Sequence, residues 1–373
     1  MTSYPNSVTI DLSALQHNLN QVKHLVGAGP RIMGVVKSDA YGHGMAPVAR
    51  ALREFGADCL GVAQLGEALE LREAGIGGPI VILSGIQTRE DAREVVDKDL
   101  TPVIYRLAMA QVIAEEGARR EKRIPVQIKV DTGMGRLGIP HRDVGIFLND
   151  VGAYGPLDIE GLVSHLSSAD EAEKGFTRTQ IKFFHEAVKA GRSMGWDLPF
   201  NSLANSAGIM NHRDSCFDMV RPGIMLYGGL PSPEFQSPVV LKPVMGFKGQ
   251  VLHMRNLPEG TAVSYGRTYI TRGPQKIAVL SAGYGAGLPR RLSNKGMVLI
   301  GGKKVEIIGK VCMNLTMASL EGVTDALPGD EVVFLGDQGA ETIRGDDMAF
   351  WAETISYEVF CSIGNGNPRQ YLK

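Results

Sequence analysis

The feature that most constrains the fold is a repeated rhythm between about residues 31 and 221, in which a short apolar run, a turn and an amphipathic stretch follow one another. This alternation is typical of βα units with parallel strands. The apolar runs begin at Ile32, Cys59, Ile80, Pro102, Val126, Ile159, Phe200 and Phe217. Eight such runs with intervening helices predict a (β/α)8 barrel, a fold that typically takes roughly 250 residues.

The stretches between the runs carry apolar residues at helical spacing and are mostly followed by Gly or Pro. We predict helices over Met45–Phe55, Leu65–Ala74, Thr88–Val96, Leu107–Glu116 and Gly175–Met194, and an earlier one over Leu12–Val26 that Asp11 or Ser13 could cap. A doubly wound open sheet is the alternative architecture. It normally has fewer strands and a glycine-rich first turn, so the barrel is favoured.

The rhythm ends at a proline-rich stretch, Leu230–Val239. Short alternating runs follow it and predict a mainly β module closed by a helix near Met348–Ser362. The pair Gly301–Gly302 lies between two apolar runs and predicts a hairpin turn. A chain of 373 residues is long for a single core. We therefore predict an α/β protein with a barrel domain over residues 1–238 and a β domain over residues 239–373.

Composition narrows the class of ligand. The chain is 44% hydrophobic and 21% charged, with a formal net charge of -1. Both signs are mixed along its length, which disfavours nucleic acid and membrane partners and favours a small molecule. The sequence shows neither a leader-like start nor an apolar run of membrane-spanning length, and its four cysteines have no paired spacing, so we expect a cytoplasmic protein with free thiols. The histidines lack metal-ligand spacing, and no protein-bound metal is expected.

Catalytic groups of a (β/α)8 barrel lie at the carboxyl ends of its strands. Lys37 directly follows the first apolar run, where apolar surroundings lower the pKa of an ammonium group. A lysine in that state can form a Schiff base with an aldehyde. Taken alone, Lys37 is better interpreted as a strand-end lysine that reaches solvent. Further polar groups follow later runs: Lys129, Asp131, Arg136, Ser164, His165, Asn205, Ser206 and Arg221.

The segment VVKSDAYGHG around Lys37 closely resembles the pyridoxal 5'-phosphate (PLP) lysine signature of the alanine racemases. The resemblance continues in family order through KVDTGMGRLG, SHLSSAD, ANSAG, RPGIMLYG, VSYGRTY, GKVCMN and ISYEVFCSI, and so covers nearly the whole chain. It implies a fold-type III PLP enzyme, an isomerase that racemises L- and D-alanine with two bases through an external aldimine. By family role it supplies D-alanine for cell-wall peptidoglycan.

The resemblance also implies roles for single residues. Lys37 binds PLP covalently and acts as one base, and Tyr265 from the second subunit of a homodimer is the base on the opposite face. The partner also contributes Tyr284 and Met313. Arg136 and the amide of Met313 bind the substrate carboxylate. Lys129 is carbamylated in many family members, where it orients the arginine.

The resemblance further implies a set of cofactor contacts. Arg221 faces the pyridine nitrogen and keeps it unprotonated, because a guanidinium does not give up its proton. An ion pair of Arg221 with a carboxylate is the competing reading. His165 lies against the ring and links Arg221 to Tyr265. The phosphate is held by Tyr41, Tyr357, Ser206 and the amides near Gly223 and Ile224, with Asn205 in the same motif.

Several positions depart from the family pattern. Asn314 stands where a carboxylate is common and Leu315 where an amide is common, and Ala286 replaces an aspartate. Leu288 and Lys310 also differ from the usual residues. These positions lie near the substrate approach by resemblance, so a broader preference that includes serine, lysine or arginine stays open.

Two other functions are less favoured. A fold-type III amino-acid decarboxylase would protonate the ring nitrogen from a carboxylate and bind phosphate with a glycine-rich loop, whereas this chain has Arg221 and no such loop. A non-catalytic PLP-binding protein of this kind would lack Tyr265 and the β domain.

Overall fold

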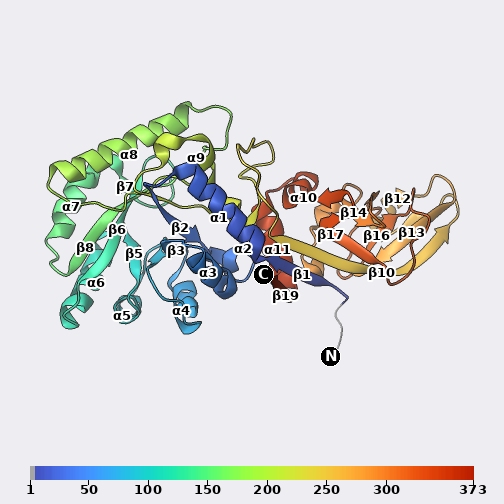
Figure 1. Ribbon diagram of the computed structural model, residues 1–373, viewed down its shortest axis with the longest axis horizontal. Coiled ribbons are helices and arrows are strands. Elements are labelled where there is room, and N and C mark those ends of the chain that lie inside the picture. Colours follow the sequence, from blue (N-terminus) through green and yellow to red (C-terminus); the bar gives the residue numbers. More distant parts are fainter. Residues whose placement is uncertain (1–4) are drawn as a thin grey trace.

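The computed structural model describes residues 5–373 and has two parts arranged along its long axis (Figure 1). A barrel of strands and helices occupies one end, and a mainly β part occupies the other. One continuous cluster of buried hydrophobic side chains includes residues from both parts. Among the residues described, no helix is long and apolar enough to cross a membrane.

The barrel strands are parallel, and their observed order follows the chain. They are β2 (Arg31–Val35), β3 (Cys59–Val62), β4 (Ile80–Ile82), β5 (Thr101–Ile104), β6 (Ile124–Asp131), β8 (Leu157–Val163) and β9 (Met219–Val220). β9 pairs with β2, and Ser202 forms isolated bridges to Val163 of β8 and Met219 of β9, which closes the ring. The predicted (β/α)8 barrel is therefore confirmed.

The seventh predicted strand, from Phe200, is reduced to that single bridging residue. The segment still bonds to both neighbours through its backbone, since Ser202 N donates to Leu162 O at 2.9 Å and Asn201 O accepts from Met219 N at 3.1 Å, and side chains add further bonds. Asn201 bonds to Leu162 N at 3.1 Å and to the Asp218 carboxylate at 2.7 Å, and Ser202 Oγ donates to Met219 O at 2.8 Å. A short extra strand, β7 (Ile139–Pro140), pairs with β6 outside the ring.

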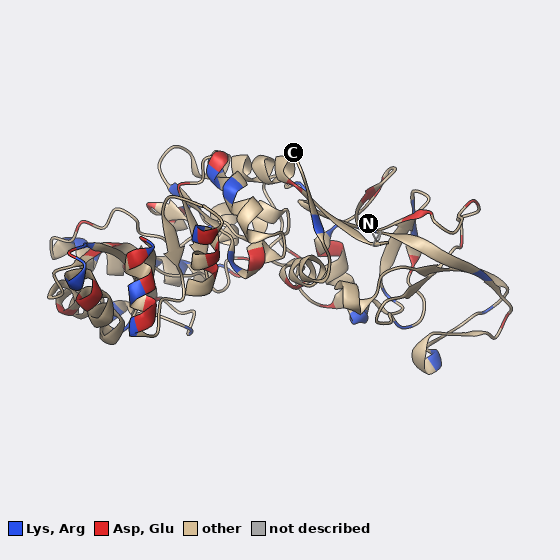
Figure 2. Cartoon of the chain, turned by 90° about the horizontal axis from the view of Figure 1, so that it is seen from below, with Lys and Arg blue, Asp and Glu red and all other residues tan. Residues whose placement is uncertain are grey.

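The helices around the barrel agree closely with those predicted from spacing. They are α1 (Leu12–Val26), α3 (Met45–Glu54), α4 (Leu65–Glu73), α5 (Arg89–Asp97), α6 (Leu107–Arg119) and α8 (Gly175–Ser193). Asp11, and not Ser13, caps α1 by accepting from Ala14 N at 2.9 Å. Three further helices were not predicted from the sequence: α2 (Lys37–Tyr41), α7 (Val144–Gly152) and α9 (Ser206–Asn211). Charges of both signs alternate on the outer helix faces (Figure 2).

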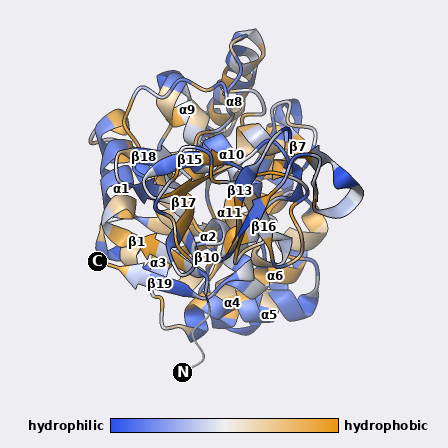
Figure 3. Cartoon of the chain, turned by 90° about the vertical axis from the view of Figure 1, so that its right-hand side faces the viewer, coloured by the Kyte–Doolittle hydropathy of each residue, from blue (hydrophilic) through white to orange (hydrophobic). Residues whose placement is uncertain are grey.

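The β part contains the remaining strands. They are β1 (Ser7–Asp11), β10 (Met245–Leu257), β11 (Ala262–Val263), β12 (Tyr269–Ile270), β13 (Gln275–Leu280), β14 (Met297–Ile300), β15 (Lys303–Glu306), β16 (Thr316–Ser319), β17 (Glu331–Gln338), β18 (Glu341–Ile343) and β19 (Arg369–Leu372). β1 pairs antiparallel with β10 and parallel with β19, so both ends of the described chain join this sheet. Figure 3 views the molecule from this end.

Two local predictions in the β part have different outcomes. The hairpin at Gly301–Gly302 is confirmed, since Ile300 pairs with Lys303 and both glycines have positive φ. The single helix predicted over Met348–Ser362 is wrong. Two helices occur, α10 (Gly345–Ala352) and α11 (Ser356–Gly366), because Glu353 adopts φ 55° and ends the first. Single 3-10 turns are η1 (His141–Asp143), η2 (Arg213–Ser215), η3 (Ile224–Tyr227), η4 (Tyr265–Arg267), η5 (Tyr284–Ala286) and η6 (Arg290–Leu292).

Candidate active site

Lys37 begins the turn that follows β2, at the carboxyl end of the barrel strands. Its side chain is half-buried. Burial lowers the pKa of the Lys37 ammonium, and the charge of Arg136 lowers it further, while Glu67 and Cys361 act in the opposite sense. A lysine whose amine loses its proton more readily is suited to form an imine with an aldehyde.

The turn after Lys37 is left-handed. Ser38, Asp39, Ala40 and Tyr41 have φ of 54°, 53°, 53° and 55°, and Gly42 follows at 80°. Left-handed helical geometry costs an L-residue about 1–2 kcal/mol. The turn contains no β-branched residue, which would suffer most. It brings the side chain of Tyr41 inward, where it is buried.

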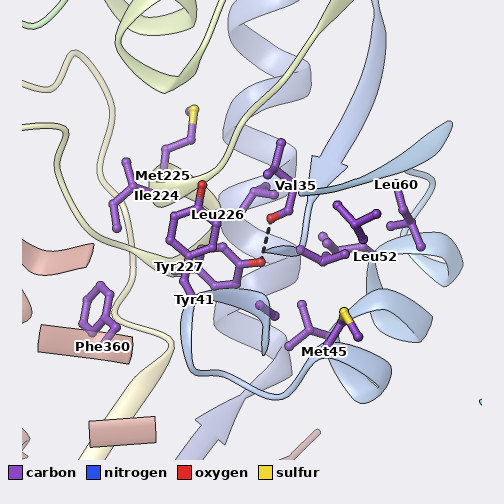
Figure 4. Close-up of a cluster of buried hydrophobic side chains, with 14 of the residues drawn as sticks. Val35, Tyr41, Met45, Leu52, Leu60, Ile224, Met225, Leu226, Tyr227 and Phe360 are labelled. Carbon is purple, nitrogen blue, oxygen red and sulfur yellow. Dashed lines mark hydrogen bonds between the residues drawn. The ribbon is translucent and has the colours of Figure 1, made fainter. Parts of the chain in front are cut away.

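Tyr41 lies in a cluster with two other tyrosine side chains. Its ring is 4.8 Å from that of Tyr227 (Figure 4) and 5.7 Å from that of Tyr357. Burial raises the pKa of both Tyr41 and Tyr357, which therefore stay protonated and can donate hydrogen bonds at neutral pH. A Cβ added to Gly223 would lie only 2.4 Å from Tyr41 Oη, so a residue with a side chain would not fit at this position.

Ser206 joins this cluster from the first turn of α9. Its Oγ accepts from Gly223 N at 3.0 Å and from Met225 N at 3.4 Å. Asn205 caps the same helix by accepting from Gly208 N. Ile224 is buried directly after Gly223. Uncharged hydroxyl and amide donors of this kind fit a phosphate group.

Arg221 is the buried cation of the site, with 4% of its surface exposed. It donates to Ser202 Oγ, to Ser164 O and, at 3.3 Å, to Leu203 O. Burial lowers its pKa to about 10, so the guanidinium is still charged at neutral pH. Within residues 5–373 Arg221 forms no ion pair with a carboxylate, and the competing reading is therefore wrong.

His165 lies beside Arg221, with Nδ1 3.4 Å from Arg221 Nη2. Burial and the charge of Arg221 lower the pKa of His165 well below its usual value. The imidazole is therefore neutral at pH 7. A neutral ring beside a charged guanidinium accepts a hydrogen bond without adding a second positive charge.

Lys129 lies in β6 with its side chain buried. Burial first, and then the charges of Arg221 and Arg136, lower its pKa to about 7. Arg136 itself is exposed on the loop after β6. Asp131 shapes that loop by accepting from Gly133 N at 2.8 Å and from Gly135 N at 3.1 Å. The barrel rim thus brings together the residues that the sequence placed at the strand ends.

Three predicted site residues of the β part, unlike Tyr357, are not part of this cluster. Tyr265, Tyr284 and Met313 are exposed to 71%, 43% and 56%. Tyr265 is in the β11–β12 arm, which Figure 1 places in the β part and away from α2. Ser264, directly before it, has φ 66° and ψ -175°, a region used almost only by glycine. Ser264 Oγ donates to Lys310 O at 2.6 Å and holds the arm.

The departures from the family pattern lie next to these exposed residues. Gly285 N donates to Met313 O at 2.7 Å, and a Cβ on Gly285 would lie 3.1 Å from Asn314 Oδ1. Ala286 O accepts from Asn367 at 2.9 Å. Neither Ala286 nor Asn314 has a carboxylate. Residues 283–288 and 312–315, around Tyr284 and Met313, therefore carry no charged side chain.

Three polar residues in or beside the left-handed turn were not predicted from the sequence. Asp39 and His43 belong to the quoted VVKSDAYGHG segment, which was the available signal. Arg369 lies at the other end of the chain and gave no signal. Its guanidinium contacts Asp39 and donates to Gly42 O at 2.9 Å.

Two family models match the chain in sequence. Residues 10–231 match the model described as alanine racemase, N-terminal domain, and residues 244–371 match that described as alanine racemase, C-terminal domain. A curated relative named alanine racemase, from Syntrophobacter fumaroxidans, is 42% identical over 364 residues, which is 98% of this chain and 96% of the relative.

Solved structures give the same result. The alanine racemase of the D-cycloserine producer Streptomyces lavendulae superposes with a TM-score of 0.93 at 34% identity, covering 100% of this chain and 98% of that one. An alanine racemase from Bartonella henselae with covalently bound pyridoxal phosphate superposes with a TM-score of 0.87 at 29% identity, covering 99% and 100%.

Proposed function

This chain belongs to the alanine racemase family and is an isomerase that interconverts L- and D-alanine, and we propose that it does so with PLP bound covalently to Lys37. The observation that carries the cofactor proposal is the buried Arg221, a charged guanidinium that has no carboxylate partner in the described part of the chain, beside a neutral His165. It favours a racemase over a decarboxylase, which would need a carboxylate at the ring nitrogen. The Bartonella henselae structure with covalently bound pyridoxal phosphate supports it further.

The donor set of the barrel rim fits the cofactor. Tyr41, Tyr357 and Ser206 would hold its phosphate together with the amides of Gly223 and Ile224, and Asn205 would fix the helix that presents Ser206. Because Gly223 has no side chain, the Tyr41 hydroxyl can lie against the main chain here, so hydroxyl and amide groups are close together for an anion to contact. When bound, PLP withdraws electrons from the α-carbon of an attached amino acid and so acidifies its proton.

Two bases would then handle that proton. Lys37, whose pKa is lowered by burial, would remove or return it on one face. Tyr265 from a second copy of the chain would act on the opposite face. The exposure of Tyr265 and its place away from α2 support a base that completes another copy's site. His165 would lie against the cofactor ring and relay hydrogen bonds between Arg221 and that phenol.

The substrate carboxylate would be bound by Arg136 and the amide of Met313, with Tyr284 beside them. Because the pKa of Lys129 is about 7, a large share of its amine is neutral and able to react with carbon dioxide. We propose that the resulting carbamate pairs with Arg136 and orients it. A native mass spectrum of the enzyme should show an added 44 Da, and an unmodified Lys129 would contradict this step.

The assembly proposed is a homodimer with shared active sites, because Tyr265, Tyr284 and Met313 are exposed in the single chain. The domain division near residue 238 would give each copy one barrel half-site and one β half-site. All four cysteines are free thiols, which supports a cytoplasmic location. There the enzyme would supply D-alanine for peptidoglycan.

A broader amino-acid preference is a second candidate. The observation that favours it is the uncharged loop at Ala286 and Asn314, next to Tyr284 and Met313. Racemisation rates for serine, lysine and arginine, measured beside alanine, would decide between the two. Rates at least about a tenth of the alanine rate would support the broader reading, since one pocket contact is typically worth that ratio.

The decisive experiment incubates the PLP-loaded enzyme with L-alanine in deuterium oxide. Formation of D-alanine with deuterium at the α-carbon is expected. Release of carbon dioxide would instead indicate a decarboxylase. Bound PLP with neither exchange nor inversion would indicate a binding protein.

A further inference from the structure

The backbone hydrogen bonds of the turn Ser38–Tyr41 do not by themselves make the turn left-handed. Its backbone bonds, such as Ala40 N to Val36 O at 2.8 Å and Gly42 N to Ser38 O at 3.0 Å, are the i to i−4 bonds of any α-helical turn. A right-handed turn would make the same bonds with less steric conflict. The surroundings must therefore select the left-handed form.

The strongest restraint comes from Arg369 in β19. Its Nη1 donates to Gly42 O at 2.9 Å and forms an ion pair with Asp39. The other carboxylate oxygen of Asp39 accepts from Met45 N at 2.6 Å, at the start of α3. One guanidinium thus connects the middle of the turn, its last residue and the next helix. The side chains of Arg369 and Asp39 are 23% and 37% exposed, so the pair is partly shielded from water.

The strand that carries Arg369 is itself fixed. β19 pairs in parallel with β1, and Val8 is the partner of Arg369. Two residues further on, Tyr371 packs so closely that a Cβ on Gly44 would lie 1.8 Å from its Oη. Helix α11 closes the other side, where a Cβ on Gly364 would lie 1.8 Å from Gly42 O.

His43 adds a restraint from within the same segment. Its Nδ1 is 3.0 Å from both Ala40 O and Tyr41 O, and its ring is 4.5 Å from that of Tyr227. This contact tightens the end of the turn, but it is local and moves with it. Glu67 of α4 also accepts from Ser38 N at 2.6 Å, but among the side-chain hydrogen bonds of residues 5–373 only those of Arg369 join the turn to the β part.

We infer that Arg369 is a positioning residue, which holds the turn left-handed so that Lys37 and Tyr41 present their side chains to the same ligand. The inference rests on the proposed function, in which these two residues bind the aldehyde and phosphate ends of PLP. Figure 4 shows the consequence at Tyr41, which lies beside Tyr227 with Phe360 of α11 nearby. The C-terminal strand is then part of the cofactor site without touching the cofactor.

The test replaces Arg369 and reads the turn directly in the protein without PLP. We expect Arg369→Met to speed amide hydrogen exchange at Ala40, Gly42 and Gly44 by about tenfold, the effect of losing one charge-assisted hydrogen bond. Amides of β3 and β4 should exchange at the wild-type rate. The matched control is Gln370→Met on the exposed side of the same strand. It should leave amide exchange unchanged both at the turn and in β3 and β4.

Two further readouts separate positioning from general stability. PLP affinity should fall by about tenfold in Arg369→Met and recover in part in Arg369→Lys, which keeps the charge but not the planar fork. The kcat for alanine should fall more than its KM rises. If Arg369→Met fails to fold, Asp39→Asn removes the ion pair while its amide oxygen can still accept from Met45 N, and it should show the same pattern more weakly.

Wild-type exchange at the turn and wild-type PLP affinity in both Arg369→Met and Asp39→Asn would overturn the inference. Failure of the proposed function is distinguishable, because exchange in the PLP-free protein does not depend on catalysis. A wild-type enzyme that cannot racemise alanine, combined with a loosened turn in Arg369→Met, would leave the positioning role standing and remove the racemase proposal.

Discussion

The barrel rim and the β11–β12 arm each carry one proposed base, but they are built differently. On the rim, Arg221 and Lys129 are buried, and Arg221 donates to Ser202 Oγ and Ser164 O. On the arm, Tyr265 is 71% exposed. This difference supports the proposal that one chain supplies the cofactor half of a site and that a second copy covers the exposed half.

Both regions also contain strained backbone, with different support. The turn Ser38–Tyr41 is held by contacts from α3, α4, α11 and β19, whereas Ser264 is held mainly by the hydrogen bond from its own hydroxyl to Lys310 O. Strained residues persist only where neighbours over-determine them. The rim should therefore be preorganised in each chain, and the arm should be the more easily perturbed half.

The largest effect is expected on the rim, from Lys37→Ala. It removes both the covalent link and one base, so kcat for alanine should fall by about 10⁴-fold or more. The bound-cofactor absorbance should shift, because no imine with lysine can form. Lys23→Ala, at a lysine outside the site, is the control and should keep wild-type activity. Substantial racemisation by Lys37→Ala would show that the rim does not carry the chemistry.

Tyr265→Phe tests the arm alone. We expect alanine racemisation to fall by about 10²–10³-fold, since one general base is lost while cofactor binding on the rim is untouched. Deuterium exchange at the α-carbon should slow much more from one enantiomer than from the other. Tyr269→Phe, which only loses a bond to Gln275 in the same arm, is the matched control. Equal slowing from both enantiomers would contradict a base that serves one face.

A third prediction concerns the buried amine of Lys129 on the rim. The pKa of Lys129 is about 7 in the folded protein against an ordinary 10.5. Between these values the unfolded chain binds one proton more, so stability rises with pH from about 7 upward and falls as pH drops toward 7. The contribution of this one group to the slope approaches about 1.4 kcal/mol per pH unit.

Urea unfolding of the PLP-free protein between pH 7 and 9, in bicarbonate-free buffer, measures this slope. Lys129→Met should flatten it, whereas the exposed Lys182→Met should leave it unchanged. An unchanged slope in Lys129→Met would mean that Lys129 is not the neutral buried amine of the rim. The arm, which has no buried lysine of this kind among the described residues, should not contribute.

The sequence predicted the rim much better than the turn within it. Parallel strands that end in polar residues place Lys129, His165 and Arg221 together for topological reasons, whatever their side chains do. The hand of the Ser38–Tyr41 turn could not be predicted, because it depends on Arg369, which is 330 residues from Asp39 along the chain. Spacing and propensity do not report such contacts.

The arm was predictable only through resemblance. From residues alone, Tyr265 is an ordinary aromatic beside a short strand, and its exposure appears only in the folded chain. The break at Glu353 was missed for a similar reason. The residue adopts a left-handed conformation and its carboxylate pairs with Arg291 and Lys295 from a distant segment. Local patterns thus fail where long-range contacts decide the backbone.

The smallest effect should come from Ser264→Ala, which sharpens the claim that the arm is weakly held. The variant keeps the strained backbone but loses the 2.6 Å bond to Lys310 O, worth about 1 kcal/mol, so kcat should fall about fivefold. Ser264→Gly loses the same bond and relieves the φ of 66°, and should be as active as the alanine variant but more stable. The measurements are kcat and the midpoint of thermal unfolding. Wild-type kcat in both variants would show that packing, rather than this hydroxyl, holds the arm. The arm would then be fixed by several contacts, as the rim is.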